Sequence, residues 1–157
     1  MTPHEYRSLL TQTLEKLDMA AVEQLVEVFL DAHARGARIF TMGNGGSGAS
    51  ASHAAGDFLK GASYGLDKRF TMICLNDNLP SMMAIANDIG WDDIFVEPLK
   101  NYLQPGDVVI GISGSGNSRN VLKAGEFAKS NGATLVGMTG FKGGKLREIA
   151  DLTIHSD

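Results

Sequence analysis

An apolar stripe runs through the first 36 residues of the chain. Its members recur every three or four positions, which is the repeat of one face of an α-helix. They are Tyr6, Leu9, Leu10, Leu14, Leu17, Val22, Leu25, Val26, Phe29 and Leu30. Thr2 followed by Pro3 is a typical helix start, Asp18 starts a second helix, and Gly36 is typical of a helix end. We therefore predict a long N-terminal helical segment over 1–36, packed partly on the sheet and partly on another subunit.

Short apolar runs alternate with helical segments from residue 37 onwards. The runs predict strands over 38–42, 71–75, 108–112, 134–138 and 152–154. The segments between them predict helices over 47–60, 80–86, 92–102, 118–130 and 145–150. Continuous apolar strands separated by helices are typical of a parallel sheet covered on both faces. We predict one α/β domain over 1–157, with a doubly wound, five-stranded parallel sheet flanked by helices.

The amino-acid composition indicates which classes of binding partner and which cellular compartment to expect. The formal net charge is −4, which provides no basis for a nucleic-acid surface or a polybasic membrane patch. No apolar stretch approaches the ~20 residues of a membrane span, and no leader segment precedes the first helix. The one cysteine, Cys74, lies in an apolar run and is interpreted as a small strand residue rather than a nucleophile. We expect a cytoplasmic protein with no nucleic-acid and no membrane partner.

Two loops rich in glycine and serine each follow a strand and precede a helix. One covers residues 43–47 (Gly-Asn-Gly-Gly-Ser) and the other residues 113–118 (Ser-Gly-Ser-Gly-Asn-Ser). In a parallel sheet such loops lie at the carboxyl ends of the strands, where helix N-termini offer free N–H groups to a phosphate. Glycine and serine also simply make turns and cap helices. Two equivalent loops favour phosphate binding, and the lack of a Gly-Lys-Ser/Thr pattern argues against a nucleotide P-loop.

His53 and Asp57 are four positions apart on a predicted helix, so they share one face. The helix starts at the first glycine-rich loop. An imidazole and a carboxylate at this spacing suit half of a divalent-metal site or an acid–base pair around a carbonyl. They equally suit an exposed pair that stabilises the helix, or a histidine satisfied in the core.

The ordered set of motifs resembles the SIS (sugar isomerase) family. It comprises residues 43–47, 52–53, 86–88, 106–118, 139–140 and 143–145. Their order and spacing are similar to those of the phosphoheptose isomerase branch of the family. The resemblance covers nearly the whole chain and implies the SIS fold.

The resemblance implies roles for individual residues. In this family the serine-rich loop binds the phosphate, the loop after the first strand contacts the sugar, and an Asn-Asp pair follows. By position, the substrate-binding residues are then Asn44, Gly45, Gly46, Ser47, Asn87, Asp88, Ser113, Gly114, Ser115 and Ser118. The family's metal-binding histidine matches His53, and its metal-binding, proton-abstracting glutamate matches Asp57. Zinc is the implied metal, and a homotetramer with active sites between subunits is the implied assembly.

Two departures from the family pattern bear on activity. Asp57 is one methylene shorter than the family's glutamate. Either Asp57 acts with a shifted backbone or a shifted substrate, or the protein is a variant that uses another substrate, or catalysis has been lost. Family members also continue past the last strand into a helix with a Gln and a His that complete the site, and these 157 residues have no match for it. We favour a longer native protein; the alternative is a short homologue.

The resemblance implies an aldose–ketose isomerase that converts sedoheptulose 7-phosphate to D-glycero-D-manno-heptose 7-phosphate through an ene-diol. In this hypothesis Asp57 is the base and His53 polarises the carbonyl. The alternative is a non-catalytic sugar-phosphate-binding SIS protein that acts as a sensor or scaffold, of the kind that binds a replication initiator. A nucleotide-binding regulator rests on fold analogy alone.

Overall fold

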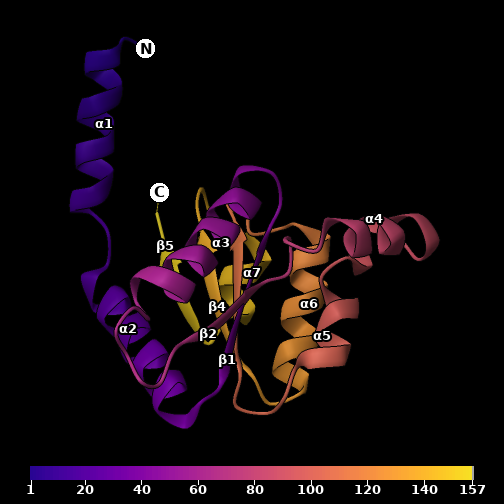
Figure 1. Cartoon of the computed structure of the whole chain (residues 1–157). Helices are drawn as coiled ribbons and strands as arrows, with labels where there is room; N and C mark the ends of the chain where they lie inside the picture. Colours follow the sequence, from indigo (N-terminus) through magenta and orange to yellow (C-terminus); the bar gives the residue numbers. More distant parts are fainter. Residues whose placement is uncertain (157) are drawn as a thin grey trace.

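A computed structural model describes residues 1–156 and has the predicted α/β architecture (Figure 1). Five strands alternate with helices along the chain. The strands are β1 (Arg38–Gly43), β2 (Thr71–Cys74), β3 (Val108–Ser113), β4 (Thr134–Thr139) and β5 (Leu152–His155). The helices are α1 (Pro3–Glu15), α2 (Met19–Arg35), α3 (Gly46–Gly56), α4 (Leu79–Asp88), α5 (Val96–Tyr102), α6 (Arg119–Ser130) and α7 (Gly144–Ile149).

The five strands form one parallel sheet in the order β2-β1-β3-β4-β5. From β1 the chain winds through α3 to β2 on one side, whereas from β3 it winds through α6 to β4 on the other side. The carboxyl ends of β1 and β3 therefore flank the switch point of a doubly wound sheet, where ligands of such folds bind.

Apolar side chains cover both faces of the sheet, as continuous apolar strands predict. On one face Ile39, Cys74 and Val108 pack with residues of α2 and α3. On the other face Phe40 and Val109 pack with residues of α5, α6 and α7. The helices thus lie in two layers around a buried sheet, and the fold class predicted from the sequence is confirmed.

An ion pair fixes the relative position of β1 and β3 at their amino ends. The carboxylate of Asp107 is 4% exposed. It accepts hydrogen bonds from the Arg38 backbone N–H at 2.9 Å, from Arg38 Nε at 3.1 Å and from Arg38 Nη2 at 2.9 Å. Both guanidinium donors reach the same oxygen, Asp107 Oδ2, whereas the backbone N–H reaches Oδ1, and charge-assisted hydrogen bonds of this kind are stronger than neutral ones. The ion pair therefore helps to hold the two strands in the register that brings their carboxyl ends together.

The N-terminal segment consists of two separate helices. Thr2 and Glu5 form a capping box at the start of α1, and the carboxylate of Asp18 accepts the N–H groups of Ala20 and Ala21 at the start of α2. Helix α2 packs on the sheet, but α1 has no buried residue and projects away from the body (Figure 1). Within one chain the predicted stripe is therefore packed only in part, since Leu25 of α2 is buried and Val22 and Phe29 are partly buried, whereas Val26 and Leu30 are 49% and 50% exposed.

Two predicted helices are divided in the structure. The one expected over 47–60 ends as α-helix at Gly56 and continues as a π-helical turn, Asp57–Gly61. The one expected over 92–102 is a 3₁₀ turn, Trp91–Asp93, followed by α5. Pro98 accounts for the second division, because proline lacks an N–H and is tolerated only in the first turn of an α-helix. Within residues 1–156, no helix is both long and apolar enough to cross a bilayer.

Candidate functional site

The loop after β1 makes a tight turn that only glycines allow. A Cβ on Gly43 would lie 2.7 Å from the Ser47 backbone, and a Cβ on Gly48 would lie 2.8 Å from the Gly43 carbonyl oxygen. Asn76 fixes the end of the strand, since its Nδ2 donates to the Gly43 carbonyl at 2.8 Å. Gly45, with φ of 54°, precedes α3 and supplies no side-chain cap. No side chain caps the start of α3, and the Ser47 and Gly48 N–H groups donate to the Asn44 carbonyl at 3.0 Å and 3.3 Å instead.

The serine-rich loop after β3 leads directly into α6. Ser113 is 4% exposed, and its hydroxyl lies 3.0 Å from that of Ser118. Ser118 precedes the first residue of α6, and its side chain makes no capping hydrogen bond. Since the first N–H groups of a helix have no intrahelical acceptors, this helix start is suited to bind an anion, with the two hydroxyls beside it.

The segment after β4 contacts the serine-rich loop through backbone hydrogen bonds. The Gly140 N–H donates to the Gly114 carbonyl at 2.9 Å, and the Leu146 N–H donates to the Gly116 carbonyl at 2.9 Å. Gly116 has φ of 65°, and a Cβ there would lie 1.7 Å from the Gly143 carbonyl oxygen. The two backbone segments are thus in direct contact, and only glycine fits at position 116 without moving one of them.

An asparagine pair joins the two loops across the switch point. Asn44 Nδ2 donates to Asn120 Oδ1 at 2.9 Å, and Asn120 Nδ2 donates to Asn44 Oδ1 at 2.9 Å. Asn44 belongs to the loop after β1, whereas Asn120 lies in the first turn of α6. The structure therefore brings the predicted sugar loop and the predicted phosphate loop into contact at the switch point.

His53 of α3 and Asp57 of the π-helical turn that continues it share one helical face, as their spacing predicts. His53 Nε2 lies 3.2 Å from Asp57 Oδ2. The two side chains are 80% and 70% exposed, in a shallow depression with Ala49, Ser50 and Ala54. An imidazole in contact with a carboxylate is a competent acid–base pair, but in a single chain it is open to water.

Asn87 and Asp88 lie apart from the other predicted site residues. Both are exposed at the end of α4, where Asn87 Nδ2 donates to Asp88 Oδ1 at 2.8 Å. Helix α4 lies at the edge of the molecule, to the right of α6 in the view of Figure 1. Asn87 and Asp88 have no hydrogen bond to either of the two loops in the described residues.

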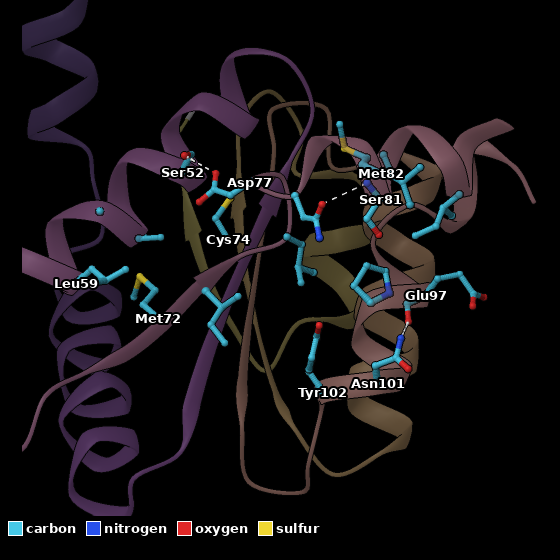
Figure 2. A pocket seen from close by; sticks show the side chains of 18 of the residues that line it. Ser52, Leu59, Met72, Cys74, Asp77, Ser81, Met82, Glu97, Asn101 and Tyr102 are labelled. Atoms are coloured by element: carbon cyan, nitrogen blue, oxygen red, sulfur yellow. Dashed lines mark hydrogen bonds between the residues drawn. The ribbon is translucent and has the colours of Figure 1, made fainter. Parts of the chain in front are cut away.

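A pocket of about 1070 Å³ lies beside the edge strand β2 rather than between the two loops (Figure 2). Its walls come from α3, α4 and α5, and most of its lining is apolar, including Leu59, Met72 and Tyr102. Asp77 borders it and accepts a hydrogen bond from Ser52 at 2.6 Å, one residue before His53 (Figure 2). The pocket is an uncovered apolar surface next to the helix that bears the acid–base pair.

Cys74 has the environment of a structural thiol. Its side chain is buried on the α3 face of the sheet. Burial raises the pKa of the Cys74 thiol, so the neutral form persists at neutral pH. The interpretation of this residue as a small apolar strand residue agrees with the structure.

Three polar residues of this region were not singled out from the sequence: Asn76, Asp77 and Asn120. Asn76 and Asp77 directly follow β2, which is a third strand end at the same edge of the sheet. The signal for Asn120 is a polar side chain in a buried helix face, since Val121, Ala124 and Ala128 of α6 are also buried. A buried polar group in an apolar face usually has a specific partner, and here that partner is Asn44.

Comparisons with known proteins identify the family. The SIS domain model matches residues 4–140. The phosphoheptose isomerase from Chlorobaculum tepidum is 34% identical over 95% of this chain and 72% of its own length. The one from Geobacter sulfurreducens is 36% identical over 91% of this chain and 75% of its own length. The structure of a phosphoheptose isomerase from Neisseria gonorrhoeae is similar with a TM-score of 0.87 and 30% identity, over 97% of this chain and 81% of that one. The chain belongs to the SIS domain family and, within it, to the phosphoheptose isomerases.

Proposed function

We propose that the protein is an aldose–ketose isomerase that converts sedoheptulose 7-phosphate to D-glycero-D-manno-heptose 7-phosphate. The observation that carries the proposal is the contact between the two loops at the switch point. There a serine-rich helix start and a glycine-rich helix start are joined by the Asn44–Asn120 pair in a member of the phosphoheptose isomerases. The phosphoheptose isomerases named above match this chain over most of its length.

The phosphate of the substrate binds at the serine-rich loop. Ser113, Ser115 and Ser118 supply hydroxyl donors, and the start of α6 supplies backbone N–H groups and the positive end of its dipole. The loop after β1, with Asn44 and residues 45–47, contacts the sugar. Binding energy from the phosphate, which does not react, orients the carbons that do.

Asp57 and His53 carry the proton transfers. In the open-chain ketose, the Asp57 carboxylate removes the proton from the carbon next to the carbonyl, and the C–H electron pair forms the C=C bond of the ene-diol. The carbonyl oxygen gains a proton from His53. Asp57 then returns its proton to the former carbonyl carbon, while the hydroxyl on the first carbon gives its proton back to His53, and the new C=O bond on that first carbon makes the product an aldose. The 3.2 Å contact within the pair supports this assignment.

His53 and Asp57 are also the residues that would hold a zinc ion. Catalytic zinc sites take three protein ligands, and this pair supplies two. Among residues 1–156, no group of three or more His, Cys, Asp or Glu side chains is placed to hold a metal. One chain therefore does not complete a zinc site, and no step of the proposed reaction depends on the metal.

A homotetramer in the cytoplasm is part of the proposal. Two apolar surfaces support assembly: the exposed stripe of α1, and the pocket beside β2. Tyr6, Leu9, Leu10 and Leu14 are 46–61% exposed on α1. A neighbouring subunit would also exclude water from the exposed acid–base pair. The single free cysteine fits a reducing compartment.

Replacing Leu9 and Leu10 by glutamate is expected to break the assembly. Light scattering of the wild type should give about four times the 16.7 kDa of one chain. The double variant should give a smaller species, because each buried leucine contributes roughly 1.5–3 kcal/mol. Gln12→Glu, on the same helix but outside the stripe, should leave the mass unchanged. A monomeric wild type, or a double variant with unchanged mass, would contradict this part of the proposal.

Sedoheptulose with and without its phosphate tests the function directly. Two charge-assisted hydrogen bonds to the phosphate, at roughly 1.5–3 kcal/mol each, predict a kcat/KM about 10²- to 10⁴-fold lower for the free sugar. Conversion of the phosphate ester to the aldose, followed by chromatography, with little conversion of the free sugar, is the expected result. Binding of the phosphate ester without conversion would instead indicate a sensor or scaffold.

A further inference from the structure

The two loops of the proposed site carry no positive charge of their own. Residues 43–47 and 113–118 contain neither lysine nor arginine, so they offer a phosphate only hydroxyl, amide and backbone N–H donors. A phosphate monoester carries a charge of about −1.5 to −2 at pH 7. Hydrogen bonds between two charged groups are stronger than those with neutral donors. A cationic side chain within reach of the serine-rich loop would therefore add to phosphate binding.

Arg119 is the first residue of α6 and directly follows Ser118 of the serine-rich loop. Side chains of an α-helix tilt toward its N-terminus, which places the stem of Arg119 on the phosphate side of its own backbone. The side chain is 83% exposed, so it can turn over the helix start without any movement of the backbone. Its planar guanidinium presents several donors in a geometry that matches the oxygens of a phosphate.

An ion pair with Asp92 holds this guanidinium in the structure. Arg119 Nη2 lies 2.9 Å from Asp92 Oδ2, and among residues 1–156 this is the one ion pair that Arg119 makes. Asp92 belongs to the 3₁₀ turn Trp91–Asp93, which precedes α5. An ion pair open to water is weak, because solvent and dissolved ions screen both charges. A bound phosphate can therefore take Arg119 from Asp92 at small cost.

A second ion pair keeps the 3₁₀ turn on α6 when the first one opens. Lys123 lies one helical turn after Arg119, and its Nζ is 2.6 Å from Asp93 Oδ1. The side chain of Asp93 is 15% exposed, compared with 34% for Asp92. Two adjacent aspartates thus differ in role, since Asp93 fixes the turn on the helix and Asp92 holds only the side chain of Arg119.

We infer that Arg119 is a phosphate-binding residue of the substrate site, and that Asp92 holds its guanidinium while the site is empty. On binding, the guanidinium leaves the carboxylate and donates to phosphate oxygens beside Ser118. The inference rests on the proposed function for the place of the phosphate, and it adds a cation to that site. Because Asp92 competes with the ligand, the two members of one ion pair should change phosphate affinity in opposite directions.

Calorimetry of the intact protein with inorganic phosphate tests this competition. Arg119→Gln should bind phosphate about tenfold more weakly, since a charge-assisted contact is lost. Asp92→Asn should bind it about two- to fivefold more tightly, because the competing carboxylate is removed. Lys123→Gln is the matched control. It removes a positive charge from the same face of α6, one turn further from the phosphate, and should leave the affinity nearly unchanged.

The double variant of Arg119→Gln with Asp92→Asn separates exchange of partners from a general effect of charge. If Asp92 acts through Arg119, its removal brings no gain once Arg119 is absent, and the double variant binds as weakly as Arg119→Gln. Equal phosphate affinity in the wild type and Arg119→Gln would overturn the inference, and so would a gain from Asp92→Asn that persists in the double variant.

The same measurements separate this inference from the proposed function. The expected affinities together with no isomerisation of a ketose phosphate would contradict the isomerase and leave Arg119 as a phosphate ligand. Isomerisation with full phosphate affinity in Arg119→Gln would overturn the role of Arg119 alone. A wild type that bound no phosphate would contradict both.

Discussion

Asp57→Asn is expected to lower kcat for the ketose phosphate by about 10²- to 10⁴-fold, the usual contribution of a general base. Asparagine has nearly the same shape but cannot accept the substrate proton. Asp57 is 70% exposed and makes its contact with His53 on the surface of the helix, so the fold should be unaffected. Steady-state rates of aldose formation measure the change, and KM should move far less than kcat because the phosphate contacts remain.

Two further variants test whether the loss of activity is due to the carboxylate of Asp57 itself. Asp67→Asn removes an exposed carboxylate outside α3 and should leave kcat unchanged. Asp57→Glu places the longer carboxylate of the family at the same position, and it should retain more activity than the asparagine variant because the base is kept. If Asp57→Asn turned over substrate as fast as the wild type, the base would have to be another group.

Gly116→Ala is expected to lower kcat/KM by about 10²-fold, the cost of misplacing a binding group by about 1 Å. The new Cβ would lie 1.7 Å from the Gly143 carbonyl oxygen, and its neighbour is backbone, so the loop itself must move. The φ of 65° adds strain for any residue with a side chain. The loss should fall mainly on KM and on affinity for inorganic phosphate, with a stability loss of roughly 1–3 kcal/mol.

Gly61→Ala is the matched control for this change. It is also a glycine-to-alanine substitution, but a Cβ at Gly61 meets no atom within 4 Å, and the residue has no positive φ. Calorimetry with inorganic phosphate should show normal affinity for Gly61→Ala and lost affinity for Gly116→Ala. Equal phosphate affinity in Gly116→Ala and the wild type would remove the serine-rich loop from the proposed site.

The sheet was predictable because burial on both of its faces makes each strand a continuous run of apolar residues in the sequence. Five apolar runs separated by helical segments gave the number of strands and their parallel direction, and the structure confirms both. Asp18 and Gly36 marked helix ends through local capping chemistry, which acts over a few residues. The π-helical turn at Asp57–Gly61 left no such local signal and was missed.

The site was only partly predictable, because half of it depends on contacts between distant segments. The two loops could be assigned to one edge of the sheet because each directly follows a strand of a predicted parallel sheet. Asn44 and Asn120 are 76 positions apart in the sequence, and their contact is seen only in the folded structure. The same holds for the contact of Gly116 with Gly143. Asn87 and Asp88 were placed in the site through the resemblance, and they have no hydrogen bond to either of the two loops in the described residues. Assembly of subunits is the proposed reason why an exposed acid–base pair can operate without free access of water.

Solvent deuterium incorporation is the most direct test of the proposed ene-diol chemistry. Wild-type protein is incubated with sedoheptulose 7-phosphate in heavy water beside Asp57→Asn, and proton NMR follows the hydrogens on the carbon next to the carbonyl. The account predicts exchange of one of these hydrogens in the wild type and its loss in the variant. Tight binding of the sugar phosphate with no exchange in the wild type would contradict the isomerase and favour a sensor or scaffold.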